Sequence, residues 1–446
     1  MDDSRLAFDI PLAGRRKVVC SFDGGEMTSD AGFVLISEAD RLLGLTQALA
    51  DEVEDSRQQA KVKHVTHDIV RERVYSIAMG YEDANDLSTL RDDPALKVAC
   101  HKRPLEDEAL ASQPTISRFE NSIGRKQLLG MGKRMARMVV GQLPAETRRV
   151  ILDIDATDDP CHGQQELRLF DGHLGRYCYL PLYMHITDET GRQRLMGTLL
   201  RSACGRSTKG VMSMVRLGVR IVRERFPDAR IVLRGDCGFG YGKLMNWCDA
   251  HGAGYVFGLQ AMKPVQEMAL GVQMDTAIKH SWAGEGCREY GDVSYRGKTW
   301  DRSRRIVIKA EAKGGVIDTR YVVTSDTDLT AEDIYIWYTQ RGDLENRIKE
   351  MKLDLSSGRT SCHRFLANQF RLMLHTAACV VVGVLQAGLS GTRWSKAQVG
   401  TLRLRLLKVG ARVVESCRTV WLHLPTSFPD KDIWSHLRRA VCAGVT

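Results

Sequence analysis

The stretch RVILDID, residues 149–155, decides the fold that this sequence predicts. A short apolar run that ends in acidic residues is typical of a buried strand. A second run, ARIVLRG at residues 229–235, has the same texture and leads directly into Asp236. Ligand sites in α/β sheets favour strand ends, which makes Asp155 and Asp236 candidate site residues. An Asp at the end of a strand is equally often a turn former or a helix cap.

The segments around these two runs predict a mixed α/β sheet. Two further strands and a helix are expected before the strand at 229–235, at residues 177–187, 194–200 and 211–225. Strand, strand, strand, helix, strand is the opening of such a sheet.

Residues 260–325 have a different pattern, because apolar and polar side chains alternate there as in antiparallel strands. The expected strands are residues 290–298, 304–311 and 318–324, with a Gly-rich turn at 313–315. This predicts a β-rich insertion that is longer than an ordinary connection.

The chain divides into five regions by these patterns. The first is helical, with apolar residues at helical spacing in 67–79, and the last contains a hairpin near 411–424 and an amphipathic helix. The region after the insertion is expected to hold a helix that starts at a capping-box-like Thr330 and Asp333, and another at 365–386. The expected boundaries are residues 1–145, 146–259, 260–325, 326–390 and 391–446.

The helix that starts near Thr330 carries a row of functional side chains. These are Tyr338, Arg341, Glu345 and Lys352. At about 100° per residue, the four fall on one stripe about 60° wide. A neighbouring apolar stripe would pack on the sheet, formed by Leu344, Ile348, Met351 and Leu355. An exposed face with an ordinary salt bridge between Arg341 and Glu345 would explain the polar stripe as well.

Three carboxylates at two strand ends and on one helix suit a divalent metal site. Mg²⁺ and Mn²⁺ prefer carboxylate oxygens. Two such ions about 4 Å apart stabilise the attacking and leaving oxygens of a phosphoryl displacement. Asp155, Asp236 and Glu345 could hold the pair, while Arg341 and Lys352 would bind flanking phosphates and Tyr338 would donate a hydrogen bond to one.

Composition limits the classes of protein that remain. Of 446 residues, 43% are hydrophobic, so a sizeable core is possible, and a net charge of +9 permits a polyanionic partner without requiring one. The 12 cysteines show no zinc or disulfide spacing and are expected to be reduced thiols. No secretory signal or membrane-spanning run is expected, since the best apolar stretch, near 377–385, is short. These features indicate a cytoplasmic protein.

The stretch SQPTISRF, residues 112–119, predicts another helix start, in which Ser112 would be the cap and Pro114 would lie in the first turn. A Thr-x-Ser-Arg start is common in DNA-reading helices, which makes Arg118 a candidate DNA contact. A plain surface helix explains the same residues.

The motifs together resemble a known family. The spacing Tyr338-x₂-Arg341-x₃-Glu345-x₆-Lys352 matches the Y-R-E-K signature of the insertion-sequence-four superfamily of bacterial DDE transposases. The phrases DAT at 155–157 and LRGDCGF at 233–239 resemble its two Asp motifs. The wider phrases LDIDATDDP at 152–160 and residues 112–121 are similar to the thirteen-eighty group within it.

The resemblance implies an α/β fold with an RNase H-like core, interrupted by the β-rich insertion between Asp236 and Glu345. It implies two Mg²⁺ or Mn²⁺ ions at the three carboxylates. The expected partner is double-stranded DNA, as the terminal inverted repeats of the element and as target DNA. A homodimer would act in the synaptic complex, and the helical region 1–145 would bind the repeat ends. Cleavage and strand transfer would follow, with a hairpin as one route.

In such proteins a Trp of the insertion can stack on a flipped base, which makes Trp300 a candidate, with phosphate contacts from Arg302, Arg304 and Arg305. A buried strand Trp is an equal alternative. Asp153 lies two residues before Asp155 on the same side of the strand and competes with it as the metal ligand. A metal-dependent nuclease that cuts without joining, and a non-catalytic DNA-binding protein derived from a transposase, remain as rival functions.

Overall fold

The computed structural model describes residues 5–8, 10, 16–203, 208–283 and 286–443, in a mixed α/β arrangement. The chain forms two compact units. We call Asn121–Thr376 the central unit, and Met1–Glu120 together with Ala377–Thr446 the terminal unit. The first and last of the five regions expected from the sequence thus contribute to one unit.

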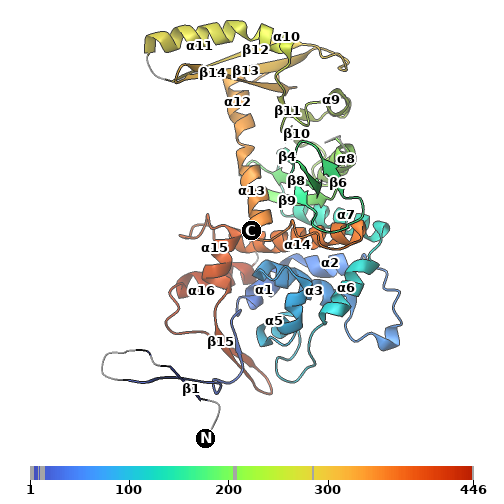
Figure 1. Cartoon of the computed structure of the whole chain (residues 1–446), viewed down its shortest axis with the longest axis vertical. Helices are drawn as coiled ribbons and strands as arrows, with labels where there is room; N and C mark the ends of the chain where they lie inside the picture. The colour runs from blue at the N-terminus through green and yellow to red at the C-terminus, as the bar shows by residue number, and fades with distance from the viewer. Residues whose placement is uncertain (1–4, 9, 11–15, 204–207, 284–285, 444–446) are drawn as a thin grey trace. The chain divides into compact units, whose positions relative to one another are not determined.

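One eight-stranded sheet is the frame of the central unit, with the order β12-β13-β14-β11-β10-β4-β8-β9 (Figure 1). Its three middle strands run parallel, and the strands on either side pair antiparallel. In the order of the sheet the strands are Cys287–Tyr295, Arg304–Lys313, Val316–Thr324, Gly254–Leu259, Arg230–Gly235, Arg149–Ala156, Leu182–Thr187 and Gln193–Leu199.

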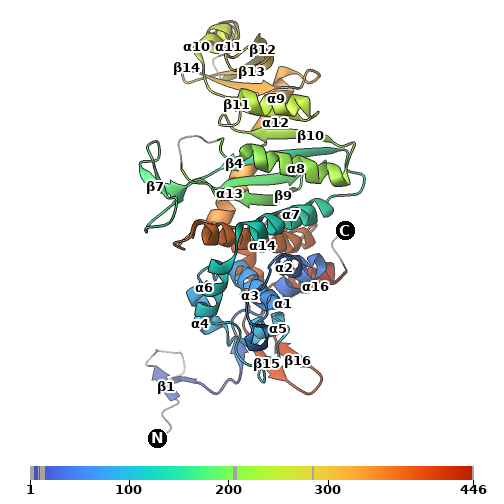
Figure 2. The same cartoon turned by 90° about the vertical axis from the view of Figure 1, so that its right-hand side faces the viewer.

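The two faces of this sheet bury different helices. Alternate side chains of a strand point to opposite faces. Leu152 of β4 lies under α8 (Val211–Arg225), where Gly218 permits a close approach, since a Cβ there would lie 3.6 Å from the Leu152 side chain. Asp153 and Asp155 lie on the other face, which α12 (Ala331–Thr339) and α13 (Gly342–Leu353) cover. Figure 2 shows α8 on the near side of the strands and α13 behind them.

Most expected elements of the sheet are confirmed, among them the helix 211–225, the strand that holds Asp155 next to its last residue, and the strand that ends before Asp236. The single strand expected at 177–187 is wrong. It is two strands, β7 (Arg176–Tyr179) and β8, in different sheets. Pro181 stands between them and cannot donate to a ladder. β7 pairs instead with β5 (Asp159–Pro160) and β6 (Leu169–Asp171).

The expected β-rich insertion is confirmed in its second half only. Two helices come first, α10 (Lys263–Met268) and α11 (Leu270–Ala283), and the three strands then extend the main sheet through β14 and β11. The sequence pattern that indicates α11 is an apolar residue at every fourth position, which sequence reasoning missed. In the central unit these four side chains are exposed, at Leu270, Met274, Ile278 and Trp282.

The single long helix expected from Thr330 onward is also a correction. Its start is confirmed, since the Thr330 hydroxyl accepts the Asp333 N–H at 3.1 Å. The helix is interrupted at Gln340 and Arg341, however, between α12 and α13. The Arg341 N–H bonds to the Tyr338 carbonyl at 3.1 Å, which is the tighter i to i−3 pattern. The angular positions calculated for one regular helix therefore do not hold across this break.

The terminal unit joins the two ends of the chain (Figure 1). Its α3 (Thr66–Met79) and the hairpin of β15 (Ala411–Glu415) and β16 (Val420–His423) are confirmed. The first region is not wholly helical, because β3 (Met27–Thr28) pairs with β15. The other elements of the unit are β1 (Arg5–Phe8), β2 (Val18–Ser21), α1 (Phe33–Leu43), α2 (Leu45–Ala50), η1 (Gln59–Lys61), η2 (Ala84–Asp86), α4 (Leu87–Leu90), α5 (Pro94–Ala99), α15 (Val399–Leu402), η3 (Arg403–Leu407) and α16 (Lys431–Ala443).

Helix α7 (Arg125–Gly141), expected in the first region, packs on β9 and α8 in the central unit, which also contains α9 (Gly242–Ala250). Two helices, α6 (Gln113–Ser122) and α14 (Phe365–Gly388), contain residues of both units. Among the described residues, α14 alone is long and apolar enough to cross a membrane, and 78% of its apolar window is buried inside the protein. The apolar stretch is thus longer than expected, and its burial is that of a core helix.

Burial of Glu72 in α3 makes the stability of the protein depend on pH. Its carboxylate accepts the Ala111 N–H at 3.0 Å, and burial raises its pKa to about 8. Because the pKa of Glu72 is higher in the folded than in the unfolded protein, Glu72 contributes most to stability below its unfolded-state pKa. This contribution is lost as the pH rises through its folded-state pKa. The thermal unfolding temperature should therefore decrease as the pH is raised from about 5 to about 8.

In Glu72→Gln this fall should be smaller, because the amide does not ionise. Circular dichroism melts across the pH range measure it. Glu108→Gln, at a side chain that is 81% exposed, is the control and should keep the original slope. Equal slopes for the original protein and Glu72→Gln would contradict the assignment.

Candidate active site

The parallel pairing of β4 with β10 brings two carboxylates together. Ile154 is the register partner of Gly235, so the next residues, Asp155 and Asp236, leave the two strands side by side. Asp155 is 9% exposed and Asp236 is half-buried. The sequence placed each Asp at a strand end, and the register puts these two ends next to each other.

Each of these carboxylates is held by its own backbone through one oxygen. The Ala156 N–H donates to Oδ1 of Asp155 at 2.8 Å, and the Gly238 N–H donates to Oδ1 of Asp236 at 2.9 Å. The Oδ2 atoms accept no hydrogen bond from the part of the chain that the structure describes. One oxygen of each carboxylate is therefore oriented by the fold and the other is available to a ligand.

The electrostatics of the pair favour a cation. Burial, followed by the negative charge of Asp236, raises the pKa of Asp155 to about 6 against the opposite effects of the Ala156 N–H and Arg341. Two carboxylates that share one site resist full ionisation unless positive charge offsets them. The charge of Glu345 also raises the pKa of Asp155, which places this third carboxylate within electrostatic reach.

The third carboxylate belongs to a row of contacts along the helix break. Arg341 donates to the Glu345 carboxylate at 2.9 Å and, through Nε, to the Tyr338 phenol oxygen at 3.2 Å. Glu345 remains 58% exposed. The Tyr338 phenol lies over Gly258 of β11, where a Cβ would be 2.6 Å from the phenol oxygen and 2.9 Å from the Cys237 nitrogen.

The donor set fits hard divalent cations, although it is not assembled into a compact cluster. No group of three or more His, Cys, Asp or Glu side chains among the described residues is close enough to hold a metal ion. Asp155 and Asp236 each offer a carboxylate oxygen from adjacent strands, and carboxylate oxygen is what Mg²⁺ and Mn²⁺ prefer. Glu345 is engaged with Arg341 and would have to exchange this partner to join them.

The Lys352 ammonium, predicted as a phosphate contact, bonds to oxygens of the protein, and its side chain remains 30% exposed. Its ammonium donates to the Thr157 hydroxyl at 3.1 Å and to the Asp158 carbonyl at 2.9 Å, with the Asp158 carboxylate at 3.2 Å. Thr157 and Asp158 are two and three residues after Asp155. Lys352 therefore ties α13 to the segment that carries the first carboxylate.

Asp153 does not compete with Asp155 in this geometry. Its side chain is fully buried and forms an ion pair with Arg234, at 2.6 and 2.9 Å. The Gln193 amide donates to it at 3.1 Å. Both oxygens are thus occupied within the protein, which favours Asp155 as the site residue.

The candidate DNA contacts of the insertion are mostly internal. Trp300 is 7% exposed and its ring packs edge-on against Tyr295. Arg304 has a side chain only 1% exposed, and its guanidinium binds Asp249 of α9 and Asp301. Trp300 is thus buried, as in the alternative to base stacking that the sequence also allowed. Burial likewise keeps the Arg304 side chain from contact with a partner.

The other two cations of this group differ in exposure. Arg305 binds Asp292 and donates to the carbonyls that lead into α12, of Asp326 and Leu329. Arg302 pairs with Asp249 at 2.6 Å but remains 57% exposed. Arg118 of α6 is exposed as well, because Ile116 and Phe119 form the buried side of that helix.

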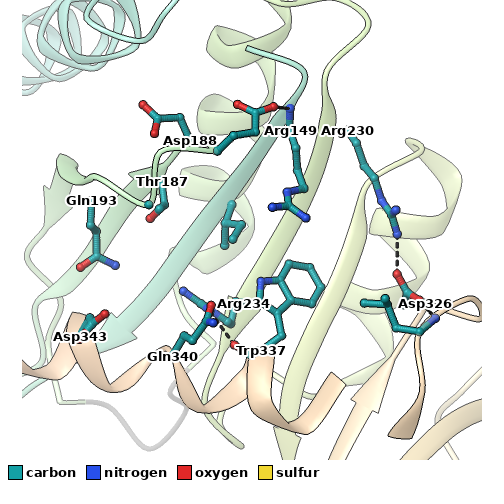
Figure 3. A pocket seen from close by; sticks show the side chains of 14 residues that line it. Arg149, Thr187, Asp188, Gln193, Arg230, Arg234, Asp326, Trp337, Gln340 and Asp343 are labelled. Atoms are coloured by element: carbon teal, nitrogen blue, oxygen red, sulfur yellow. Dashed lines mark hydrogen bonds and ion pairs between the residues drawn. The ribbon is translucent and has the colours of Figure 1, made fainter. Parts of the chain in front are cut away.

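Sequence reasoning missed Arg234 and Gly258 as residues that shape the site. Arg234 immediately precedes the Gly-Asp of the second strand end, and it also borders a pocket of about 480 Å³ between the sheet and α12 (Figure 3). The pocket is lined by Arg149, Ile151, Thr187, Asp188, Glu189, Gly191, Gln193, Arg230, Arg234, Asp326, Leu329, Trp337, Gln340 and Asp343. An Arg before a strand-end Asp was the only available signal for its role.

Comparison with known families gives one result. The model of a family described as transposase DDE domain group 1 matches residues 10–442. No curated protein matches the chain.

The close contact at Gly258 generates a stability prediction. In Gly258→Ala the added Cβ meets the Tyr338 phenol and the backbone at Cys237. The free energy of unfolding should therefore decrease by roughly 1–3 kcal/mol, as for other overpacked sites. Guanidinium chloride unfolding measures it. Gly271→Ala in α11, where no atom lies within 4 Å of the added Cβ, should cause no loss. An unchanged midpoint in Gly258→Ala would mean that Tyr338 does not lie over β11.

Proposed function

The chain belongs to the family of DDE transposase domains, and we propose that it is a transposase whose catalytic carboxylates are Asp155, Asp236 and Glu345. The observation that carries the assignment is the side-by-side placement of Asp155 and Asp236 at the ends of parallel strands. We propose in the same way that β9, β8, β4, β10 and β11, with α8 and α9 between the later strands, are an RNase H-like core.

The proposed activity is cleavage of DNA strands at the terminal inverted repeats of the element, followed by strand transfer. The three carboxylates would hold two Mg²⁺ or Mn²⁺ ions, which supply a deprotonated water and stabilise the leaving oxygen. The backbone amides of Ala156 and Gly238 hold Asp155 and Asp236 in place, so that their free oxygens need little reorganisation. Finer membership, in the insertion-sequence-four superfamily and its thirteen-eighty group, is proposed from the Y-R-E-K spacing.

Arg341 is the cation best placed to respond to bound DNA. It binds both Glu345 and the Tyr338 phenol, and its guanidinium can also bind a phosphate by its fork. A phosphate on Arg341 would compete with Glu345 and leave that carboxylate free to join the two Asp residues. The Tyr338 phenol accepts from Arg341, so its own proton can be donated to a phosphate oxygen.

Recognition of the DNA ends is proposed for the helical part of the chain, with Arg118 as an exposed contact, and Arg302 is proposed as the contact of the insertion. Two copies would act together on a pair of ends. A route through a hairpin at the element end is compatible with the same carboxylates, and no covalent protein–DNA intermediate is proposed.

The carboxylates give the most direct test of the function. In Asp155→Asn, Asp236→Asn and Glu345→Gln, Mg²⁺-dependent strand cleavage should fall by more than about 100-fold, because even outer partners of metal ligands are worth about 10–100-fold. Labelled duplexes that cover the DNA on either side of this coding sequence are the substrate, and DNA affinity should be retained. Asp343→Asn, an exposed carboxylate on the same helix, is the matched control and should cleave normally.

Undiminished cleavage in Glu345→Gln would refute the assignment. Cleavage without joining, in an assay with paired ends and a target plasmid, would instead identify a metal-dependent nuclease.

The salt dependence of DNA binding by a Lys352 variant distinguishes two roles of this side chain, which are holding the segment after Asp155 and binding a DNA phosphate. In Lys352→Met, cleavage should fall by about 10-fold or more, because the segment after Asp155 loses its link to α13. The slope of log Kd against log salt concentration should not change, whereas loss of a phosphate contact lowers it by about one. Lys349→Met, at an exposed position of α13, is the control. A slope lowered by one in Lys352→Met, with cleavage reduced only as far as affinity, would restore the phosphate-binding role.

A further inference from the structure

We infer that Asp153 and Arg234 are a positioning pair, which holds the two strands that carry Asp155 and Asp236 and the helix break before Glu345 in one fixed geometry. This inference rests on the proposed function, since it assigns a role toward the same three carboxylates. Neither residue would touch the metal ions or the DNA.

The pair joins the two strands directly behind the site. Asp153 and Arg234 are register partners in β4 and β10. Each lies two residues before its strand-end carboxylate and therefore on the same face of the sheet. Nε and Nη2 of Arg234 donate to the two oxygens of Asp153 at 2.6 and 2.9 Å, which is the fork geometry that fixes orientation as well as distance.

The same guanidinium also holds the helix break. Its Nη1 donates to the Trp337 carbonyl at 2.7 Å, a contact drawn in Figure 3. In a regular helix this carbonyl would accept the N–H of Arg341, but that N–H bonds to Tyr338 instead. Arg234 thus replaces the hydrogen bond that the break removes.

The position of the break matters for the site. It separates Tyr338, whose phenol lies beside the Asp236 strand end, from Glu345 in the first turn of α13. The direction of α13 relative to the strands is thus not set by helix geometry alone. The bond from Arg234 to Trp337 fixes the end of α12 against the strands at the point where α13 begins.

Stability alone does not account for a charged pair at this place. The Asp153 and Arg234 side chains are 0% and 4% exposed. The free-energy cost of removing both charges from water offsets most of the free energy gained from their attraction. Apolar side chains of similar volume are often neutral or stabilising replacements for a buried ion pair. An apolar pair cannot, however, donate to the Trp337 carbonyl or fix the fork geometry, and this difference allows an experiment.

The test compares Asp153→Leu, Arg234→Met and the double variant Asp153→Leu/Arg234→Met. Each single change leaves one buried charge without its partner, so the unfolding midpoint should fall in both. In the double variant the midpoint should recover most of this loss. Its cleavage of the flanking-DNA duplex should nevertheless stay about 100-fold below that of the original protein, the loss typical of a misplacement of about 1 Å.

Two further readouts distinguish positioning from a purely structural role. The Mn²⁺ concentration for half-maximal cleavage should rise in the double variant, while DNA affinity measured in EDTA should not change. Arg194→Met is the matched control, because Arg194 lies in β9 of the same sheet and pairs with the buried Asp188, which follows β8, and not with α12. It should lower the midpoint and leave cleavage unchanged at a temperature where the protein is folded.

Cleavage by the double variant at the original rate and with the original Mn²⁺ dependence would overturn the inference. If the double variant does not fold, Arg234→Lys decides by the same rule. Lysine keeps the charge near Asp153 but has no fork to reach Trp337 as well, so cleavage should still fall and original cleavage would overturn the inference. Cleavage by the original protein that is lost in Glu345→Gln supports the proposed function whichever result is obtained, and absence of that cleavage would refute the function itself.

Discussion

The parallel pairing of β4 with β10 is the constraint on which the rest of the site depends. It places two carboxylates at neighbouring strand ends, partly out of water, where their mutual repulsion and desolvation raise the pKa of Asp155 to about 6. Such a pair is stable as two anions only beside positive charge. Gly258 belongs to the same constraint, since the absence of a side chain there lets Tyr338, and with it Arg341, approach the strand ends.

The cations around the site already bind oxygen atoms of the protein in this structure. Arg234 pairs with Asp153, Lys352 with the Thr157–Asp158 segment, and Arg341 with Glu345. Their first effect is therefore to hold elements in place. The net charge of +9 therefore does not tell which cations could contact DNA, because a formal charge count does not distinguish cations that face solvent from cations buried in ion pairs. Arg304, fully enclosed beside α9, shows this difference most clearly.

Local apolar pattern predicted the elements that bury one continuous run, such as β4, β10 and α8, because burial is read from side chains within a few residues of each other. The register that aligns Asp155 with Asp236 followed from the parallel order of these strands. Two features could not be read in this way. The break at Arg341 and the burial of Trp300 depend on partners far along the chain, Arg234 for the former and Gly242 for the latter. A single sequence contains no local signal for such pairings.

The helix break also changes what the Y-R-E-K spacing means physically. In one regular helix, equal spacing alone would place Tyr338, Arg341, Glu345 and Lys352 on one stripe. Across the break, this alignment needs external support at both ends. Arg234 holds the carbonyl of Trp337 before the break, and Lys352 binds the segment after Asp155 near the end of α13. Glu345 lies between these two attachments, and each of them leads back to a strand that carries one of the Asp residues. The relative placement of the three carboxylates is therefore a property of the sheet, transmitted to the helix by two buried or half-buried cations.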